Sequence, residues 1–216
     1  MAPPRGHFIT LEGIEGAGKS TQLATVCSEL QRAGIVPVVT REPGGAPMAE
    51  QIRAMLLDPA SQGMTSDTEL LLMFAARAEH IHRTIEPALA AGRWVLCDRF
   101  TDATYAYQGG GRGVDPARIA TLEDLVQGGL RPNLTLLFDV SAEIGLARAK
   151  GRAALDRFES ESIAFFTRAR DAYLAIAERE PIRVRIIDAG QPLPVVSATV
   201  SELLRSYLAA EGQRAR

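Results

Sequence analysis

The sequence predicts an α/β fold, in which a parallel sheet of about five strands carries helices on both faces. Short apolar runs rich in β-forming residues recur along the chain, and a segment of helical character follows most of them. Parallel strands need such long crossover connections. The first run also ends in a glycine-rich turn that opens a helix. With 216 residues, 46% of them hydrophobic, the chain can build one sizeable core, and we expect a single domain over residues 1–216.

The first two strands are expected at residues 7–13, "HFITLEG", and at residues 36–40, "VPVVT". Both are apolar and rich in β-branched residues, which is typical of a buried strand. A helix should lie between them, from Ser20 to about Ala33, and end at Gly34. The cluster "REPGGAP" after the second strand indicates a turn.

A long helix is expected over "LLLMFAARAEHIHRTIEPALA", residues 70–90. The preceding Ser66 and Glu69 have the spacing of a capping box, so we expect the helix to begin there. Three further strands are expected at 93–99, 133–140 and 184–190, with helical segments between them. Ligands of such a sheet gather beyond the carboxyl ends of its strands.

The overall charge argues against some classes of partner. The formal net charge is -2, so composition gives no sign of binding to polymeric nucleic acid or to an acidic membrane. No apolar stretch is long enough to span a bilayer, and the N-terminus does not resemble a signal peptide. Cys27 and Cys97 lie outside any CxxC pattern and are expected to be buried thiols in a reducing compartment. We therefore expect a cytoplasmic protein.

The segment "GIEGAGKST" carries the strongest motif of the chain. Gly13, Gly18, Lys19 and Ser20 match G-x-x-x-x-G-K-[ST], between an expected strand and an expected helix. Glycines let consecutive N–H groups face phosphate oxygens, and the helix N-terminus adds positive potential. Lys19 would neutralise the β- and γ-phosphates, and Ser20 would bind Mg²⁺. The residues expected to bind ATP are Gly13, Ile14, Glu15, Gly16, Ala17, Gly18, Lys19, Ser20 and Thr21.

The motif indicates that a nucleoside triphosphate is the phosphate donor, but it does not show which reaction the protein catalyses. No N-K-x-D element is present to read guanine. Asp98, at the end of an expected strand, has the position of a second Mg²⁺ ligand, and Arg99 follows it where a hydrolase would carry a glutamate. An arginine at this place suits a second anion, such as an acceptor phosphate. The alternative is an ion pair between Asp98 and Arg99 at the strand end.

Glu15 occupies a variable position of the motif, where a carboxylate would face an anionic ligand. It makes sense if it accepts a hydrogen bond from the acceptor; the alternative is that it points to solvent. No basic residue occupies positions 14–17, so a transition-state arginine must come from elsewhere. The basic segment at 147–161, which contains Arg152 and Arg157, is a candidate lid. The alternative for this segment is a solvated charged helix.

Together these residues resemble the thymidylate kinase family over nearly the whole chain. The motifs that carry the resemblance are "LEGIEGAGKST" at 11–21, "TREPGG" at 40–45, "FAARAEH" at 74–80, "DRF" at 98–100, "AYQGGGRG" at 106–113 and "LDRFE" at 155–159. The resemblance is to the bacterial class with catalytic arginines in the lid. It implies a nucleoside monophosphate kinase-like P-loop fold and the reaction ATP + dTMP → ADP + dTDP, with Mg²⁺, in a homodimer.

The resemblance also implies residue roles. Phe74 would stack on thymine and Arg77 would donate to its O4, and their spacing places both on one helix face. Tyr107 would lie under the deoxyribose, and Pro43 would follow a cis peptide bond. The residues expected to bind dTMP are Glu15, Arg41, Arg53, Phe74, Arg77, Arg99, Thr104, Tyr107 and Gln108, and those expected to act in catalysis are Lys19, Glu15, Asp98, Arg99, Arg152 and Arg157.

Gln108 would bind the polar edge of thymine. Its amide has both a donor and an acceptor and can turn over, so we expect Arg77, which only donates, to separate thymine from cytosine. Two positions depart from the family pattern: Ala103 lacks a polar group, and Lys150 replaces a frequent arginine. A kinase for dCMP, dUMP or a deoxynucleoside remains an alternative function, as does a nucleotide-dependent switch or binding protein.

Overall fold

The computed structural model describes residues 4–149 and 157–214. Its centre is a five-stranded sheet with the order β2-β3-β1-β4-β5, and every neighbouring pair of strands is parallel. The strands are β1 (Phe8–Glu12), β2 (Val38–Arg41), β3 (Val95–Asp98), β4 (Leu134–Asp139) and β5 (Val184–Asp188). The five expected strands and the parallel α/β fold are confirmed, with strand ends shifted by at most two residues.

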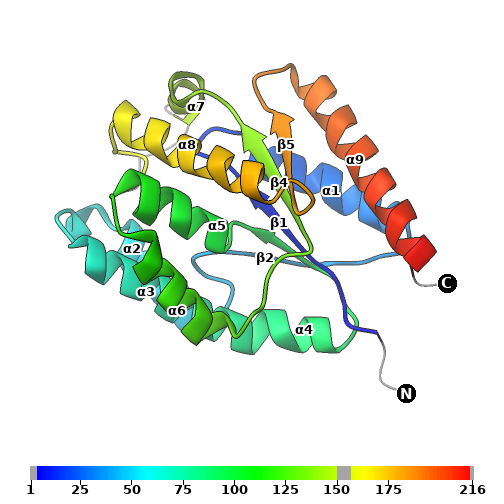
Figure 1. The fold of residues 1–216 in the computed structure, drawn as a ribbon, viewed down its shortest axis with the longest axis horizontal. Helices are drawn as coiled ribbons and strands as arrows, with labels where there is room; N and C mark the ends of the chain where they lie inside the picture. The colour runs from blue at the N-terminus through cyan, green and yellow to red at the C-terminus, as the bar shows by residue number, and fades with distance from the viewer. Residues whose placement is uncertain (1–3, 150–156, 215–216) are drawn as a thin grey trace.

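Helices connect the strands and cover the sheet. They are α1 (Lys19–Arg32), α2 (Pro47–Leu57), α3 (Ser66–His80), α4 (Glu86–Ala90), α5 (Thr101–Thr104), α6 (Pro116–Gln127), α7 (Ala142–Ala149), α8 (Ile163–Arg179) and α9 (Leu193–Arg214), with the 3₁₀ turn η1 (Pro59–Ser61) and the π-helical turns η2 (Ile81–Ile85) and η3 (Tyr105–Gly111). Helices α1 and α9 pack together beside the strands, and α8 packs against η3 on the opposite side of the sheet (Figure 1). Within the described ranges, no helix has the length and apolar character that a membrane span needs.

The long helix expected over 70–90 is interrupted. It consists of α3, the π-helical turn η2 and α4, and its first residue, Ser66, is the residue expected to be the N-cap. The N-cap is Thr65, whose side chain accepts a hydrogen bond from the backbone N–H of Thr68. The assignment of Ser66 and Glu69 to a capping box is therefore wrong. Glu69 is buried and binds cationic side chains instead of the helix end.

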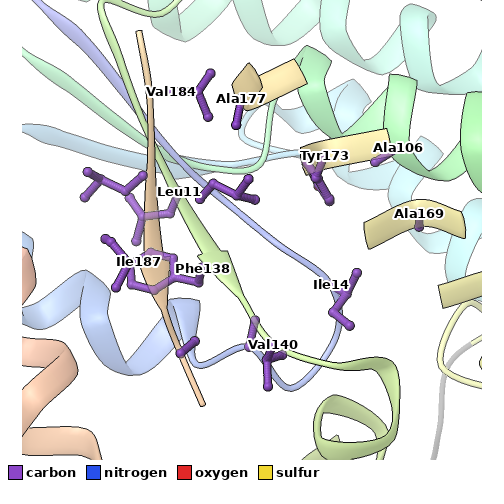
Figure 2. Close-up of a cluster of buried hydrophobic side chains, with 14 of the residues drawn as sticks. Leu11, Ile14, Ala106, Phe138, Val140, Ala169, Tyr173, Ala177, Val184 and Ile187 are labelled. Atoms are coloured by element: carbon purple, nitrogen blue, oxygen red, sulfur yellow. The ribbon is translucent and has the colours of Figure 1, made fainter. Parts of the chain in front are cut away.

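The core lies on both sides of the central strands. Strands β1, β3 and β4 are buried at nearly every position and mostly apolar, as expected for a parallel sheet covered on both faces. Figure 2 shows Leu11, Phe138 and Ile187, from β1, β4 and β5, in the largest cluster of buried side chains, together with Tyr173 from α8. This packing fixes the strand ends, where the cavity described below opens.

Candidate active site

A cavity of about 230 Å³ lies beyond the carboxyl ends of β1, β2 and β3. Its walls bring together segments that are far apart in the sequence. They are Glu15–Ser20 after β1, Arg41–Pro43 after β2, Arg53 and Leu57 of α2, Met73 and Arg77 of α3, Asp98–Phe100 after β3, Ala103, Thr104, Tyr107 and Gln108 of α5 and η3, and Phe158 and Glu159. The phosphate-binding motif and most of the residues expected to bind the acceptor thus share one cavity.

The glycine-rich turn has the conformation that the motif requires. Gly16 and Gly18 have φ angles of 71° and 86°, in the left-handed region that favours glycine. A Cβ atom on Gly16 would also clash with the backbone oxygen of Gly145. Gly18 caps α1 without a side-chain hydrogen bond, so the first N–H groups of the helix are left for a ligand.

Lys19 is buried at the base of this turn. Its Nζ donates to the backbone oxygens of Gly13 and Ile14, at 2.9 and 3.1 Å. Burial and the nearby Arg99 lower the pKa of Lys19 to about 8. A bound phosphate would restore the preference for the charged ammonium group.

Arg99 joins the donor and acceptor sides of the cavity. Its φ angle is 69°, unusual for a residue with a side chain. Nη2 donates to Oε1 of Glu15 at 2.7 Å, Nη1 donates to the backbone oxygen of Gly13 at 2.7 Å, and the guanidinium lies 4.8 Å from the centre of the Tyr107 ring. Burial opposes its charge, but Glu15 raises the pKa of Arg99 well above its usual value. The structure therefore pairs Arg99 with Glu15 and not with Asp98.

Glu15 and Asp98 both face the cavity. Glu15 accepts from Arg99 and from the Tyr107 hydroxyl, at 2.7 and 3.3 Å, which contradicts the alternative that it points to solvent. Asp98 Oδ1 is buried without a hydrogen-bond partner among the described residues. Such a carboxylate oxygen is costly unless a cation or donor binds it, so its placement beside the exposed Ser20 fits a Mg²⁺ site.

Glu12 supports this end of the site from behind. It is fully buried at the end of β1, accepts from the backbone N–H of Phe100 at 2.6 Å and accepts from the Tyr173 hydroxyl at 2.7 Å. The Tyr173 hydroxyl in turn accepts from Arg99 at 3.2 Å. Burial and the nearby Asp102 raise the pKa of Glu12 to about 8. The only sequence sign of this role is a glutamate at the end of an apolar strand.

Arg77 is held at the other end of the cavity. Nε donates to Oε2 of Glu42 at 2.8 Å, and Nη2 donates to the Thr104 hydroxyl at 3.0 Å. Nη1 is buried and has no hydrogen-bond partner in the described part of the chain. A carbonyl oxygen of a bound base would satisfy this donor.

The turn after β2 positions Glu42. The peptide bond between Glu42 and Pro43 is cis, which confirms the expectation for Pro43. His80 is fully buried and bonds Glu42 Oε1 through Nδ1 at 2.9 Å and the Thr40 hydroxyl through Nε2 at 2.7 Å. Glu42 and His80 were not among the expected site residues, although they lie in "TREPGG" and "FAARAEH", two of the segments that carry the family resemblance.

The two remaining acceptor arginines lie on the cavity wall. Arg41 donates to Glu50 at 2.9 Å, and Arg53 donates to the backbone oxygen of Pro43 at 2.8 Å. Phe74, the expected stacking residue, does not line the cavity. It lies in a buried cluster with Leu70 and Ile119, and the centre of its ring is 4.8 Å from the Arg77 guanidinium. Its stacking role stays a prediction.

The expected lid is described only at its two ends. Arg148 donates to the backbone oxygen of Ala189 at 2.8 Å, whereas Lys150 and Arg152 lie outside the described residues. Arg157 is buried, donates to the backbone oxygen of Leu56 at 2.7 Å and pairs with Glu69 at 2.7 Å. It does not line the cavity in this structure, so its place at the reacting phosphates stays a prediction.

Comparisons with known proteins agree with this site. The family model described as thymidylate kinase matches residues 11–200. The chain is 58% identical to a thymidylate kinase of Pseudomonas savastanoi, over 94% of this chain and 97% of the relative. It is 60% identical to a thymidylate kinase of Alkalilimnicola ehrlichii, over 94% of each chain. A crystal structure of thymidylate kinase from Ehrlichia chaffeensis superposes with a TM-score of 0.75 at 35% identity, covering 94% of this chain and 99% of that one.

Proposed function

The chain belongs to the thymidylate kinase family and phosphorylates dTMP to dTDP with ATP, and we propose which residues of its cavity carry out this reaction. One observation carries the assignment of roles. A single cavity joins the glycine-rich turn around Lys19 to the unpartnered buried donor of Arg77. The first group suits a nucleoside triphosphate, and the second suits a carbonyl oxygen such as thymine O4.

The donor side binds the phosphates of ATP. The backbone N–H groups of residues 13–21 cradle the phosphates, and Lys19 neutralises their charge. Ser20 and Asp98 would hold Mg²⁺, which would supply positive charge against the phosphates of ATP. The orphaned Oδ1 of Asp98 supports this assignment.

The acceptor side binds dTMP. Arg41, Arg53 and Arg99 lie on the wall nearest the turn after β2 and the strand end of β3, and they hold the acceptor phosphate. Glu15 fixes the guanidinium of Arg99 and accepts a hydrogen bond from the 3′-hydroxyl of the sugar. If it does, Glu15→Gln should reduce the preference for dTMP over its 3′-deoxy analogue, because the acceptor loses its charge; an undiminished preference would exclude this contact.

At the base, Arg77 donates to thymine O4, Gln108 and Thr104 bind the polar edge, Phe74 stacks on the ring and Tyr107 lies under the sugar. Arg152 and Arg157 supply positive charge to the transferring phosphoryl group. The reaction needs no covalent enzyme intermediate, so the contribution of these residues is orientation and electrostatic stabilisation. Residues 1–216 act as one domain, in a cytoplasmic homodimer.

An acceptor panel tests the proposed function. ADP release is followed with a coupled assay in the presence of Mg²⁺ATP and dTMP, dUMP, dCMP, thymidine or no acceptor. We expect the highest kcat/KM with dTMP and negligible release without an acceptor. Faster turnover with dCMP or a nucleoside would show a different kinase, and rapid release without an acceptor would show a nucleotide-dependent switch.

A further inference from the structure

Glu69 is a buried carboxylate that the roles above do not use. It lies on α3, is 1% exposed, and receives hydrogen bonds or ion pairs from three side chains. Gln108 Nε2 donates to Oε1 at 2.9 Å, Arg112 donates to both oxygens at 3.2 Å, and Arg157 Nη1 lies 2.7 Å from Oε2. The carboxylate thus contacts the cavity residue Gln108 and two arginines at once.

The two arginines keep Glu69 ionised. Burial alone would favour the protonated acid, but hydrogen bonds from Arg112, Gln108 and Arg157 outweigh it and lower the pKa of Glu69. An ionised carboxylate has no proton to donate, so it only accepts hydrogen bonds. Among the two ends of the Gln108 amide, only the NH₂ group can face it. Turning the amide over would bring the carbonyl oxygen of Gln108 against a negative charge.

We propose that Glu69 determines base specificity by positioning: it fixes the Gln108 amide so that its carbonyl oxygen is the group presented to N3 of the pyrimidine. This inference rests on the proposed function, in which Gln108 binds the base. Thymine and uracil carry N–H at N3 and would donate to this oxygen. Cytosine carries a lone pair at N3, so two acceptors would face each other, which is unfavourable in a buried site. The sequence alone suggested that the Gln108 amide is free to turn over. In this proposal the contact with Glu69 prevents it from turning.

This selection differs from the one that Arg77 makes. Arg77 reads the group at position 4 of the base, whereas the pair of Glu69 and Gln108 reads N3. Both positions distinguish thymine from cytosine and neither distinguishes thymine from uracil. Two buried polar contacts of fixed direction give a larger discrimination than one.

The variant Glu69→Gln tests the proposal. The new amide at position 69 can donate to the Gln108 carbonyl as well as accept from its NH₂ group, so the Gln108 amide can turn to suit cytosine. We expect the ratio of kcat/KM for dTMP over dCMP to fall about tenfold to a hundredfold, mainly through KM and with a gain for dCMP. The ratio for dTMP over dUMP should not change. A fall of both activities with an unchanged dTMP/dCMP ratio would overturn the proposal.

Glu161→Gln is the matched control. Glu161 is a second carboxylate that pairs with Arg112, at 2.6 Å, and it makes no hydrogen bond to Gln108 in the described part of the chain. Neutralising Glu161 removes an ion pair from Arg112 but leaves Glu69 in place. The ratio of kcat/KM for dTMP over dCMP should therefore not change. A fall of the ratio equal to that of Glu69→Gln would show that the arginine network, and not the amide direction, selects the base.

A measurement on the unmodified sequence keeps the proposal testable if Glu69→Gln does not fold. The side-chain amide signal of Gln108 in a ¹⁵N spectrum is identified by its absence from Gln108→Leu. Its protons should exchange slowly with solvent in the free protein, because they are bonded to buried Glu69. Exchange as fast as that of exposed glutamines would contradict a fixed amide.

The proposed function and this inference fail in different ways. If the parent protein does not prefer dTMP to dCMP as a phosphoryl acceptor, the proposed function is wrong. If the parent prefers dTMP and Glu69→Gln keeps the whole preference while folded, only the role of Glu69 is wrong.

Discussion

In the proposed function, single residues of the acceptor site select the base through the direction of their hydrogen bonds. Arg77 offers only donors, and its Nη1 is buried without a described partner. Opposite thymine O4 it would make a charge-assisted bond, whereas two donors would meet at the amino group of cytosine. An unmatched buried polar group costs roughly 1–3 kcal/mol, which corresponds to about tenfold to a hundredfold in kcat/KM.

We therefore predict that Arg77→Gln lowers kcat/KM for dTMP and narrows its advantage over dCMP. Uracil keeps O4, so dUMP should lose about as much as dTMP. Because Arg77 also pairs with Glu42, Arg77→Lys serves as a control that retains a cation near that carboxylate, and thermal unfolding of both variants is measured. Equal losses for dTMP and dCMP would mean that Arg77 supports the turn at Glu42 and that base selection lies elsewhere.

Lys19 predicts a pH dependence of nucleotide binding. Its pKa in the free protein is lowered to about 8, and bound phosphates raise it again. In the unfolded chain the pKa of Lys19 is higher. The folded free protein therefore gains stability from the neutral amine at a pH above the unfolded pKa. This gain is lost as pH falls through about 8, because the buried amine becomes protonated. For binding the sign is opposite: below about pH 8 the ammonium is already charged, and above it ATP must bind together with a proton.

Affinity for Mg²⁺ATP should thus fall as pH rises above about 8, with uptake of up to about one proton. Calorimetric titration at pH 7 and pH 9 in buffers of different ionisation enthalpy measures the uptake. Lys19→Met is the control, because it has no titrating group at this place. Equal uptake in the parent and in Lys19→Met at pH 9 would assign the proton to another group.

The sequence predicted some site residues far better than others. Residues 13–20 were predictable because backbone geometry and phosphate chemistry fix glycine, lysine and serine at set spacings. Glu12, Glu42 and Glu69 were not, because each makes a hydrogen bond to another side chain across the fold. A buried carboxylate of this kind has no local spacing rule. For Glu12 and Glu69 the sign is a glutamate next to apolar residues, whereas Glu42 lies in the turn cluster "REPGGAP".

At the scale of elements, the alternation of apolar runs and helical segments predicted all five strands and their parallel direction. Element ends were less predictable. Thr65 caps α3 in place of Ser66, since Glu69 is drawn to the buried arginines. The π-helical turns η2 and η3 had no signal in the sequence pattern. The strand order likewise depends on contacts between segments far apart in the chain.

The lid is the element whose role is most open to experiment. No basic residue lies at positions 14–17, so arginines of the 147–161 segment are expected to stabilise the transferring phosphoryl group. Removing such an arginine typically lowers kcat by about 10³-fold or more. We predict this loss for at least one of Arg152→Ala and Arg157→Ala, with little change in dTMP binding.

Arg157 also stabilises the fold through its contacts with Glu69 and Leu56, so the thermal stability of Arg157→Ala must be measured. Arg148→Ala is a control for the loss of a positive charge in the same segment, because Arg148 takes no part in these contacts. Single-turnover rates and dTMP affinity separate catalysis from binding. Near-normal turnover of the double variant Arg152→Ala/Arg157→Ala would rule out the lid assignment.

At the scale of the whole molecule, the exposed face of helices α2, α3 and α6 bears on the proposed homodimer. These helices pack beside one another (Figure 1). They carry exposed large apolar side chains, with Met55 54%, Leu71 57% and Leu125 78% accessible. Apolar side chains gathered on one layer of helices are typical of a protein interface.

We predict that the protein sediments at twice the mass of one chain and that Leu71→Lys/Leu125→Lys shifts it to the monomer. Ile182→Lys is the matched control, because Ile182 is equally apolar and 84% exposed but lies between α8 and β5. Sedimentation velocity over a range of concentrations measures both. A monomeric parent protein would contradict the proposed homodimer. A double variant that is still a dimer would show that the interface lies on another face of the protein.

The central claim is that this cavity transfers a phosphoryl group from ATP to dTMP. The most direct test is to incubate the protein with Mg²⁺, ATP labelled at the γ-phosphate and equal concentrations of dTMP, dUMP and dCMP, and to separate the nucleotides by chromatography. We predict that the label appears first and mainly in dTDP, with one ADP formed per labelled diphosphate. Label that appears mainly in inorganic phosphate or in the diphosphate of another acceptor would contradict the account.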